Sequence, residues 1–378
     1  MRFTKLALRN LARRPGRSVL TLVGVAFALM LLVLVEGLAA GMDRALSGSE
    51  SARTLIVFRQ NRYCPQTSFL PERYTRRIEG LDGVESVLPV KVFLSNCRAS
   101  LDVVAFQGTP VETLFATRDI EVVEGDVARF RRERQSALVG REFATRRGLE
   151  PGDRFQMGGI DVDVAGVFAS SQPIEEGLVL THLEPLQRAG AVNRLGTVTQ
   201  FEVKVHDARE AERIAREIDA LFAADEEPTD TRSQLAFLET ATRDLREILR
   251  FGRLLAIGCV AVVLALVGNT IVLSVQERLR ELGVLRTLGC KPRHLVGLLL
   301  GEALVYALGG AVLGLAGAEV LIRSAHLTLG AEGVPVAFVV TPEVVLRGLG
   351  AAIGCALLAA LLPALRAART PIVPALRT

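Results

Sequence analysis

Four apolar blocks, each long enough to cross a bilayer, constrain this chain most. They are residues 18–35, 254–275, 295–321 and 348–365, and three of the four contain no charge. A transmembrane helix needs roughly 20 mainly apolar residues, whereas a soluble helix of that length normally keeps a polar face. The chain is therefore predicted to be an integral membrane protein with four spans, and not a soluble enzyme, a disordered chain or a disulfide scaffold.

The first apolar block follows Arg13, Arg14 and Arg17, so it also has the basic flank of a secretory signal peptide. Cleaved signals usually carry apolar runs of about 7–15 residues. This block is longer, and three further spans follow it. We therefore expect an uncleaved span, with residues 1–41 forming a cytoplasmic amphipathic helix and the first transmembrane span.

The basic residues between the spans predict the orientation of the chain. Residues 1–17 carry six Lys or Arg and no acid, the 276–294 loop carries five against two acids, and the tail 366–378 carries three and no acid. Short loops rich in Lys and Arg stay in the cytoplasm. Both termini and the 276–294 loop are therefore expected in the cytoplasm. Residues 42–252 and 322–347 are expected on the outer side of the membrane.

The long insertion between the first two spans, residues 42–252, differs in charge from the rest of the chain. Residues 43–250 carry 28 Lys and Arg against 34 Asp and Glu, whereas the remainder carries 17 against 7. A nucleic-acid binder would concentrate positive charge on its soluble part, so nucleic acid is excluded as a partner and membrane lipid is expected. Residues 253–378 form the last domain, with three spans, a cytoplasmic loop and a tail.

Short strand-like and helix-like runs predict an α+β fold for the insertion. The strand-like runs are 54–58, 84–94, 103–107, 161–168 and 201–205, and the helix-like runs are 71–80 and 208–222. Before the second span, five residues follow a 3-4-3-4 spacing: Leu235, Leu238, Thr242, Leu245 and Leu249. This spacing predicts a stalk helix that continues unbroken into the span and carries motion. The alternative is a helix that only packs on its own domain.

No motif in the sequence predicts catalysis. The sequence contains no GxxxxGK[ST] phosphate loop, HExxH or GxSxG, and its four histidines show no paired spacing. The chain is therefore interpreted as a non-enzymatic subunit without catalytic, cofactor or metal residues. Cys64 and Cys97 both fall in the insertion, where they either form a disulfide, if the insertion is extracytoplasmic, or stay free thiols.

The 276–294 loop contains a short amphipathic helix with leucines on one side. Residues 277–289 read ERLRELGVLRTLG and resemble the ERxREIGxLRALG motif of the FtsX-like permeases, which include the MacB, LolC/LolE and FtsX types. The segments LRNLARRPGRS from Leu8 and LPALRAAR from Leu362 resemble the same family. VGREFA from Val139, followed by GLEPGD from Gly148, is similar to the strand-turn element of the MacB-type periplasmic domain.

This resemblance implies the permease subunit of an ABC transporter, with a MacB-type periplasmic core between spans one and two. Two such four-span subunits pair as a homo- or heterodimer, and a separate cytoplasmic ABC ATPase, which binds ATP and Mg, docks on each. Six residues match the coupling motif: Glu277, Arg278, Glu281, Gly283, Arg286 and Gly289. Cys290 and Pro292 depart from the family pattern, so the motif does not define the residue at which the coupling helix ends.

Small residues and acids within the spans predict helix contacts. Gly310 with Gly314, and Gly350 with Gly354, form small-xxx-small pairs that pack either within a subunit or across the dimer. Glu302 and Glu319 are either functional intramembrane acids or interfacial residues, and counting from the start of the third span favours the interface.

Three functions fit these observations. The first is export or extraction of a hydrophobic or envelope substrate such as a lipid, lipoprotein or drug, with a periplasmic adaptor or outer-membrane channel as further partners. The second is an FtsX-like mechanotransmission scaffold that regulates a periplasmic cell-wall hydrolase without transport, and the third is a membrane sensor without an ATPase. The insertion of about 210 residues is nearer to the MacB-type size, which favours the first.

Overall fold

The chain folds into two compact units. The computed structural model describes residues 15–46, 53–62, 67–95, 103–189, 195–277, 287, 291–325, 328–331 and 334–369. One unit, which we call the bundle, takes in residues 1–40, 248–324 and 339–378. The other, which we call the head, takes in residues 41–247 and 325–338.

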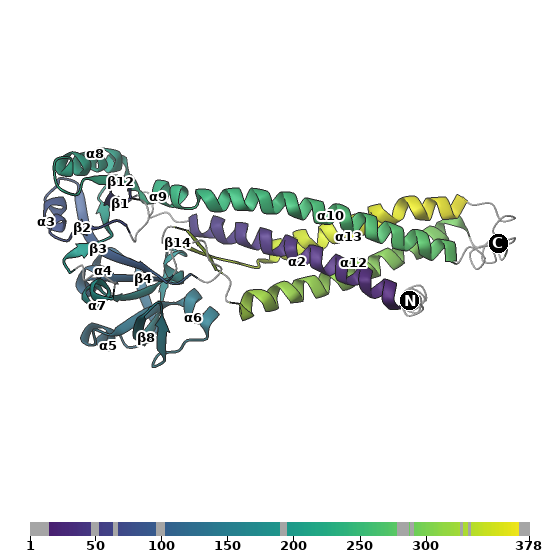
Figure 1. Cartoon of the computed structure of the whole chain (residues 1–378), viewed down its shortest axis with the longest axis horizontal. Coiled ribbons are helices and arrows are strands. Elements are labelled where there is room, and N and C mark those ends of the chain that lie inside the picture. The colour runs from purple at the N-terminus through teal and green to yellow at the C-terminus, as the bar shows by residue number, and fades with distance from the viewer. Residues whose placement is uncertain are drawn as a thin grey trace. The chain divides into compact units, whose positions relative to one another are not determined.

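Four long helices carry the apolar blocks of the sequence (Figure 1). They are α2 (Pro15–Leu46), α10 (Arg243–Glu277), α12 (Pro292–Ser324) and α13 (Pro342–Arg369). Proline occupies the first position of three of them, where its missing N–H costs no intrahelical bond. Each helix is long and apolar enough to cross a membrane, so the prediction of four spans is confirmed.

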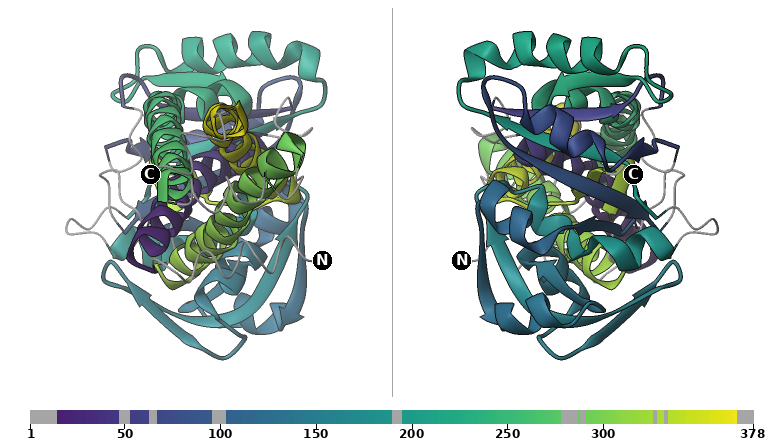
Figure 2. Two further views of the ribbon diagram at one scale, coloured as in Figure 1. Left: turned by 90° about the vertical axis from the view of Figure 1, so that its right-hand side faces the viewer. Right: turned by 90° about the vertical axis from the view of Figure 1, so that its left-hand side faces the viewer.

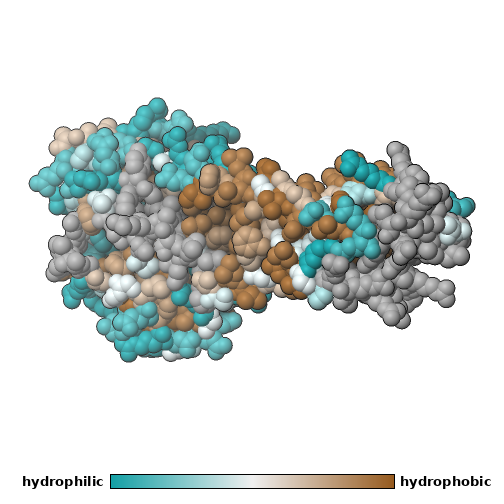
Figure 3. Space-filling model, turned by 45° about the vertical axis from the view of Figure 1, so that its right-hand side comes forward, coloured by the Kyte–Doolittle hydropathy of each residue, from teal (hydrophilic) through white to brown (hydrophobic). Residues whose placement is uncertain are grey.

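Small apolar residues make up most of the interior of the bundle, and many large ones lie on its surface. The buried cluster is rich in Ala and Val and includes Val25, Val267, Ala307 and Ala356. Phe27, Leu254, Val312, Leu358 and other large apolar side chains are exposed, and they give the helices the brown surface of Figure 3. This pattern is typical of helices that pack closely on each other and face lipid.

The head contains one ten-stranded sheet. In spatial order its strands are β12 (Thr229–Ser233), β1 (Thr54–Arg59), β11 (Gln200–Val205), β3 (Val84–Leu94), β4 (Ala105–Thr109), β9 (Val179–His182), β6 (Ser136–Gly140), β8 (Ile160–Ser170) and β5 (Ile120–Gly125), and β7 (Arg154–Met157) pairs with β8. The predicted fold class, four spans with a mixed α and β domain between the first two, is confirmed.

Strand β3 divides the head into two lobes, because its two halves pair with different strands. Residues 84–90 pair with β11 and residues 91–94 pair with β4. Where the pairing strand changes, the Thr199 side chain bonds to the backbone of β3. Its Oγ1 donates to the Val90 carbonyl and accepts from the Val92 N–H, both at 2.9 Å. We call the β12–β1–β11 side lobe 1 and the β4–β5 side lobe 2.

Short helices cover the two lobes (Figure 2). Lobe 1 carries α3 (Tyr74–Glu79), η3 (Ala208–Glu210) and α8 (Ala211–Phe222). The predicted helix over 71–80 begins later, because Pro71 instead pairs with Thr197 in the two-stranded sheet of β2 (Leu70–Pro71) and β10 (Thr197–Val198). Lobe 2 carries α4 (Val111–Thr117), α5 (Val127–Arg132), α6 (Arg141–Arg147), η2 (Glu175–Gly177) and α7 (Leu183–Arg188).

The prediction of an unbroken stalk helix is wrong, because the helix is interrupted at Thr242. Helix α9 (Gln234–Ala241) ends there, and α10 begins at Arg243. The Leu238 carbonyl accepts both the Thr242 N–H at 2.9 Å and the Thr242 hydroxyl at 2.7 Å, and such a bond from a Thr side chain to the preceding turn often bends a helix. Beyond this break α10 continues to Glu277. Of the predicted seam, Leu235 is exposed, whereas Leu238, Thr242, Leu245 and Leu249 are buried.

The connection between the third and fourth spans contributes a β-hairpin to the head, which sequence reasoning missed. Strands β13 (Thr328–Ala331) and β14 (Val334–Ala337) pair antiparallel. The buried Thr328 hydroxyl accepts a 3.1 Å bond from the backbone N–H of Val103, which fixes the hairpin to lobe 2. Two segments of the head, α9 and this hairpin, therefore continue directly into spanning helices.

Candidate functional site

The predicted coupling loop begins at the end of α10. Glu277 is the last residue of that helix, and its carboxylate forms a 3.1 Å ion pair with Arg17 of α2. Arg278, Glu281, Gly283, Arg286 and Gly289 lie outside the described residues. The Arg17–Glu277 pair connects α2 to the last residue of α10, where the predicted loop begins.

A layer of buried polar side chains joins three helices at this end of the bundle, which we call the Arg17 end. Ser18 and Tyr306 are linked through their hydroxyls at 3.0 Å, and Thr21 and Thr270 at 2.9 Å. Ser274 donates to the Glu302 carboxylate at 3.2 Å. Interhelical bonds of this kind hold spans together where the surroundings offer no water.

The two acids of the third span have different surroundings. Glu302 is only 3% exposed and accepts the bond from Ser274 inside the bundle. Glu302 thus contacts another helix instead of water, and its position near the membrane interface stays a prediction. Glu319 pairs with Arg323 one turn further along the same helix and is partly exposed.

An ion cluster links three helices at the opposite end, which we call the Glu36 end. Arg253 of α10 lies 3.3 Å from the Glu36 carboxylate of α2, and Arg347 of α13 lies 3.6 Å from its other oxygen. Helix α2 is thus tied to α10 at both ends. Arg17 and Glu36 are 19 residues apart, about 28 Å along a helix, which matches a hydrocarbon core of roughly 30 Å.

The two glycine pairs differ in what surrounds them. A Cβ on Gly314 would lie 2.5 Å from the Ala26 carbonyl oxygen and 3.0 Å from the Leu29 Cβ. Gly310 likewise lies against Val25, so these two glycines of α12 face α2. A Cβ on Gly350 or Gly354 would meet nothing within 4 Å, so a contact of this pair across a dimer stays a prediction.

The cysteines of the head cannot be assigned a pairing, because Cys64 and Cys97 lie outside the described residues. Cys259 and Cys355 of the bundle are free thiols. Among the described residues, no group of three His, Cys, Asp or Glu side chains is arranged to hold a metal ion.

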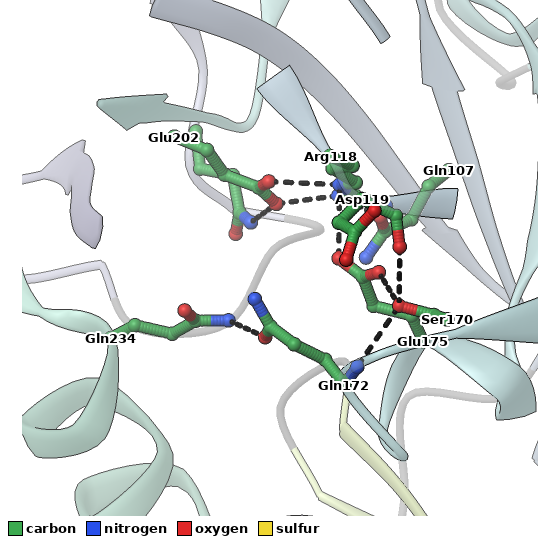
Figure 4. Close-up of polar contacts among 9 residues, drawn as sticks. Gln107, Arg118, Asp119, Ser170, Gln172, Glu175, Glu202 and Gln234 are labelled. Atoms are coloured by element: carbon green, nitrogen blue, oxygen red, sulfur yellow. Dashed lines mark hydrogen bonds and ion pairs between the residues drawn. The ribbon is translucent and has the colours of Figure 1, made fainter. Parts of the chain in front are cut away.

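A buried charged cluster joins the two lobes of the head (Figure 4). Arg118 follows α4 in lobe 2, and its guanidinium binds both carboxylate oxygens of Glu202 on β11 of lobe 1, at 3.0 and 2.6 Å. It also donates to Gln107 at 2.6 Å and lies 3.4 Å from Glu175 of η2. Burial by itself would lower the pKa of Arg118, but Glu202 and then Glu175 outweigh it and raise the pKa, so the residue stays charged.

Sequence reasoning missed this cluster for a specific reason. The pattern placed 201–205 in a strand, and in such a strand Glu202 alternates with apolar residues and reads as a solvent-facing position. In the fold both faces of β11 are covered, and Glu202 is 8% exposed. Arg118 and Glu202 are 84 residues apart, so no local spacing connects them.

Two family models and a curated relative match this chain. The family model described as MacB-like periplasmic core domain matches residues 18–221, and the model described as FtsX-like permease C-terminal matches residues 253–372. The macrolide export ATP-binding/permease protein MacB of Wolinella succinogenes is 26% identical over 98% of this chain. The chain spans 60% of the length of that curated relative.

Two solved structures resemble the head more distantly. The extracellular domain of the noncanonic ABC-type transporter YknZ from Gram-positive bacteria is 15% identical, with a TM-score of 0.36 over 47% of this chain and 99% of that domain. The periplasmic region of MacB from Actinobacillus actinomycetemcomitans is 10% identical, with a TM-score of 0.35 over 50% and 92%.

Fold and site together define a multi-pass membrane protein with four spans and a two-lobed domain between the first and the second. The periplasmic-core model alone covers just over half of the chain, and the permease model covers most of the rest. The chain belongs to the family of FtsX-like, MacB-type ABC transporter permeases.

Proposed function

We propose that this chain is the membrane subunit of an ABC transporter, in which a separate ATPase works at the Arg17 end of the bundle and the head moves in response. The observation that carries the proposal is that two ion pairs connect α2 to α10, Arg17–Glu277 at one end and Glu36–Arg253 at the other. Both helices lead to the head, and α10 leads to the coupling loop. A pair of helices fixed at both ends moves as one body.

The proposed orientation places the Arg17 end and both termini in the cytoplasm of a bacterium and the head outside its inner membrane. The basic segments 1–17, 276–294 and 366–378 support it, because Lys and Arg in short loops stay on the cytoplasmic side. ATP and Mg then bind on the ATPase, which docks on the 276–294 loop.

We propose export or extraction of a hydrophobic or envelope substrate that moves outside the bundle. The buried apolar cluster of Ala and Val side chains fills the bundle interior, and such packing leaves no room for a wide aqueous path. The relative named for macrolide export supports a hydrophobic cargo such as a drug, lipid or lipoprotein. The alternative is an FtsX-like regulator of a cell-wall hydrolase, and we favour transport because the insertion of about 210 residues is nearer to the MacB-type size.

A second permease subunit completes the proposed transporter, and the Gly350–Gly354 face of α13 is its proposed contact. This face has room for added side chains within the chain, as expected where another helix packs from outside. A periplasmic adaptor or an outer-membrane channel is a further proposed partner of the head.

Glu281→Lys tests the proposal, because it reverses one charge in the segment proposed to contact the ATPase. We expect the ATPase that co-purifies with the wild type in mild detergent to fall at least about tenfold, since losing one partner of an interfacial charge pair costs roughly 2–5 kcal/mol. Membrane insertion should be unchanged. Co-purification is measured by quantitative mass spectrometry.

Glu150→Lys is the matched control, because it makes the same charge change at an exposed position of the head. It should leave the ATPase bound. Equal amounts of ATPase with the wild type and with Glu281→Lys would refute the assignment of the coupling loop.

A further inference from the structure

The loop that connects β8 to β9 contacts several parts of the head that are distant in sequence. We call residues 170–177, from the end of β8 through η2, the relay loop. Gln172 accepts a 3.0 Å bond from Gln234, the first residue of α9. The η2 turn also contacts β14 of the hairpin. The relay loop therefore contacts two of the head's segments that continue into spanning helices, α9 toward α10 and the hairpin between α12 and α13.

Inside the relay loop, hydrogen bonds connect these inputs to the charged cluster. The Ser170 hydroxyl accepts a 3.0 Å bond from the Gln172 N–H and donates a 2.5 Å bond to the Glu175 carboxylate. Glu175 in turn lies 3.4 Å from the Arg118 guanidinium. Figure 4 shows the sequence of contacts from Gln234 through Gln172 and Ser170 to Glu175 and Arg118.

From Arg118 the path crosses to lobe 1. The planar guanidinium donates one hydrogen bond to each oxygen of Glu202, and we call this pair of bonds the Arg118–Glu202 fork. Two such bonds fix the relative orientation of the two groups as well as their distance. The side chains of Arg118, Glu175 and Glu202 are 5%, 7% and 10% exposed. Water therefore offers these charges little compensation if the fork opens, so the fork holds the lobes at one angle.

Helix α9 also contacts lobe 1 directly, through apolar side chains of α9 and β1. Phe237 of α9 packs on Phe58 of β1 with ring centroids 5.5 Å apart, beside the buried Ile56. Helix α9 therefore contacts lobe 1 through Phe237 and the relay loop through Gln234. A movement of α9 must either move both lobes or break one of these two contacts.

We propose that the relay loop carries movement of the spanning helices from α9 and the hairpin to the charged cluster, and that the Arg118–Glu202 fork makes the two lobes follow as one body. This role rests on the proposed function, because it requires a movement of the bundle to transmit. It assigns Arg118, Glu175, Gln172 and Gln234 a positioning role, and none of them contacts a substrate in this account.

The test measures the distance between the lobes in the full-length protein in detergent. Spin labels on unnatural amino acids replace Arg216 of α8 in lobe 1 and Thr145 of α6 in lobe 2, both exposed. The wild-type distance distribution should be narrow. Arg118→Lys keeps the charge but loses the fork, so the distribution should broaden roughly twofold. Glu202→Gln, which keeps an acceptor, should broaden it less.

A second label pair separates the two parts of the path. With labels at Glu239 of α9 and Thr145, Gln172→Ala should broaden the α9–lobe 2 distance while the interlobe distance stays narrow. Arg154→Lys is the matched control, because Arg154 also grips one carboxylate, that of Asp161, but at an exposed site. It should change neither distance.

Unchanged interlobe distances in both Arg118→Lys and Glu202→Gln would overturn the proposal, and so would equal broadening by Arg154→Lys. These distances are read without an ATPase. Failure here together with loss of the ATPase in Glu281→Lys would remove the relay and leave the proposed transporter function standing. The expected distances together with a retained ATPase in Glu281→Lys would leave the contact between the lobes standing, but would remove the proposed function and with it the movement that the relay transmits.

Discussion

Gly314→Leu should separate α2 from α12 and destabilise the bundle by about 3 kcal/mol, the upper part of the usual range for overpacking a tight core. The added side chain has nowhere to go, because its Cβ alone would lie 2.5 Å from the Ala26 carbonyl oxygen and 3.2 Å from the Met30 N atom. Backbone atoms of another helix cannot rotate away as a flexible side chain can. Thermal unfolding of the purified protein in detergent measures the loss.

Gly354→Leu is the control for this prediction, since a Cβ there meets nothing within 4 Å. It should leave the stability of the single subunit nearly unchanged. If Gly354 faces a second subunit, the variant will lose the dimer without losing the fold. Equal stability of Gly314→Leu and the wild type would contradict the close packing of α2 on α12.

Arg118→Met should cost the head about 3–5 kcal/mol of its free energy of unfolding, because it leaves buried carboxylates without their cation. Glu202 loses a two-bond partner and Glu175 loses its nearest positive charge. The effect should appear in denaturant unfolding of the full chain, followed by a probe in the head, as a lower midpoint.

Arg154→Met provides the comparison, because its partner Asp161 and its own side chain are 35% and 73% exposed. Exposed ion pairs contribute roughly 0–1 kcal/mol, so this variant should unfold almost as the wild type does. A cost for Arg118→Met no greater than that for Arg154→Met would show that the interlobe cluster does not stabilise the head.

The spans were predictable because lipid imposes a pattern that needs no knowledge of the fold. An uncharged run of about 20 residues has few stable alternatives to a spanning helix. The sequence also predicts one apolar face of α8 from the spacing of five residues. Four of them are buried, and Leu221 is half-buried: Ala211, Ile214, Ala215, Ile218 and Leu221. Both patterns are local, which is why they are visible in the residues alone.

The stalk and the charged clusters depend on tertiary contacts, which local patterns do not contain. The seam through Thr242 has coiled-coil spacing, but the hydroxyl of that residue bonds to the Leu238 carbonyl at the point where α9 ends. Glu36 and Arg253 are separated by 217 residues, and Arg118 and Glu202 by 84. The charges of residues 322–347 predict only the side of the membrane, and the hairpin of β13 and β14 depends on its contact with lobe 2 through Thr328 and Val103.

The central claim is that work done on one side of the membrane moves a head on the other, and the sidedness of the chain tests it most directly. In a cysteine-free background, Glu150→Cys of the head and Arg293→Cys at the start of α12 are exposed positions for a membrane-impermeant maleimide. The account predicts that Glu150→Cys reacts in intact spheroplasts and that Arg293→Cys reacts only after lysis. Labelling of both from the same side, or in the reverse order, would contradict it.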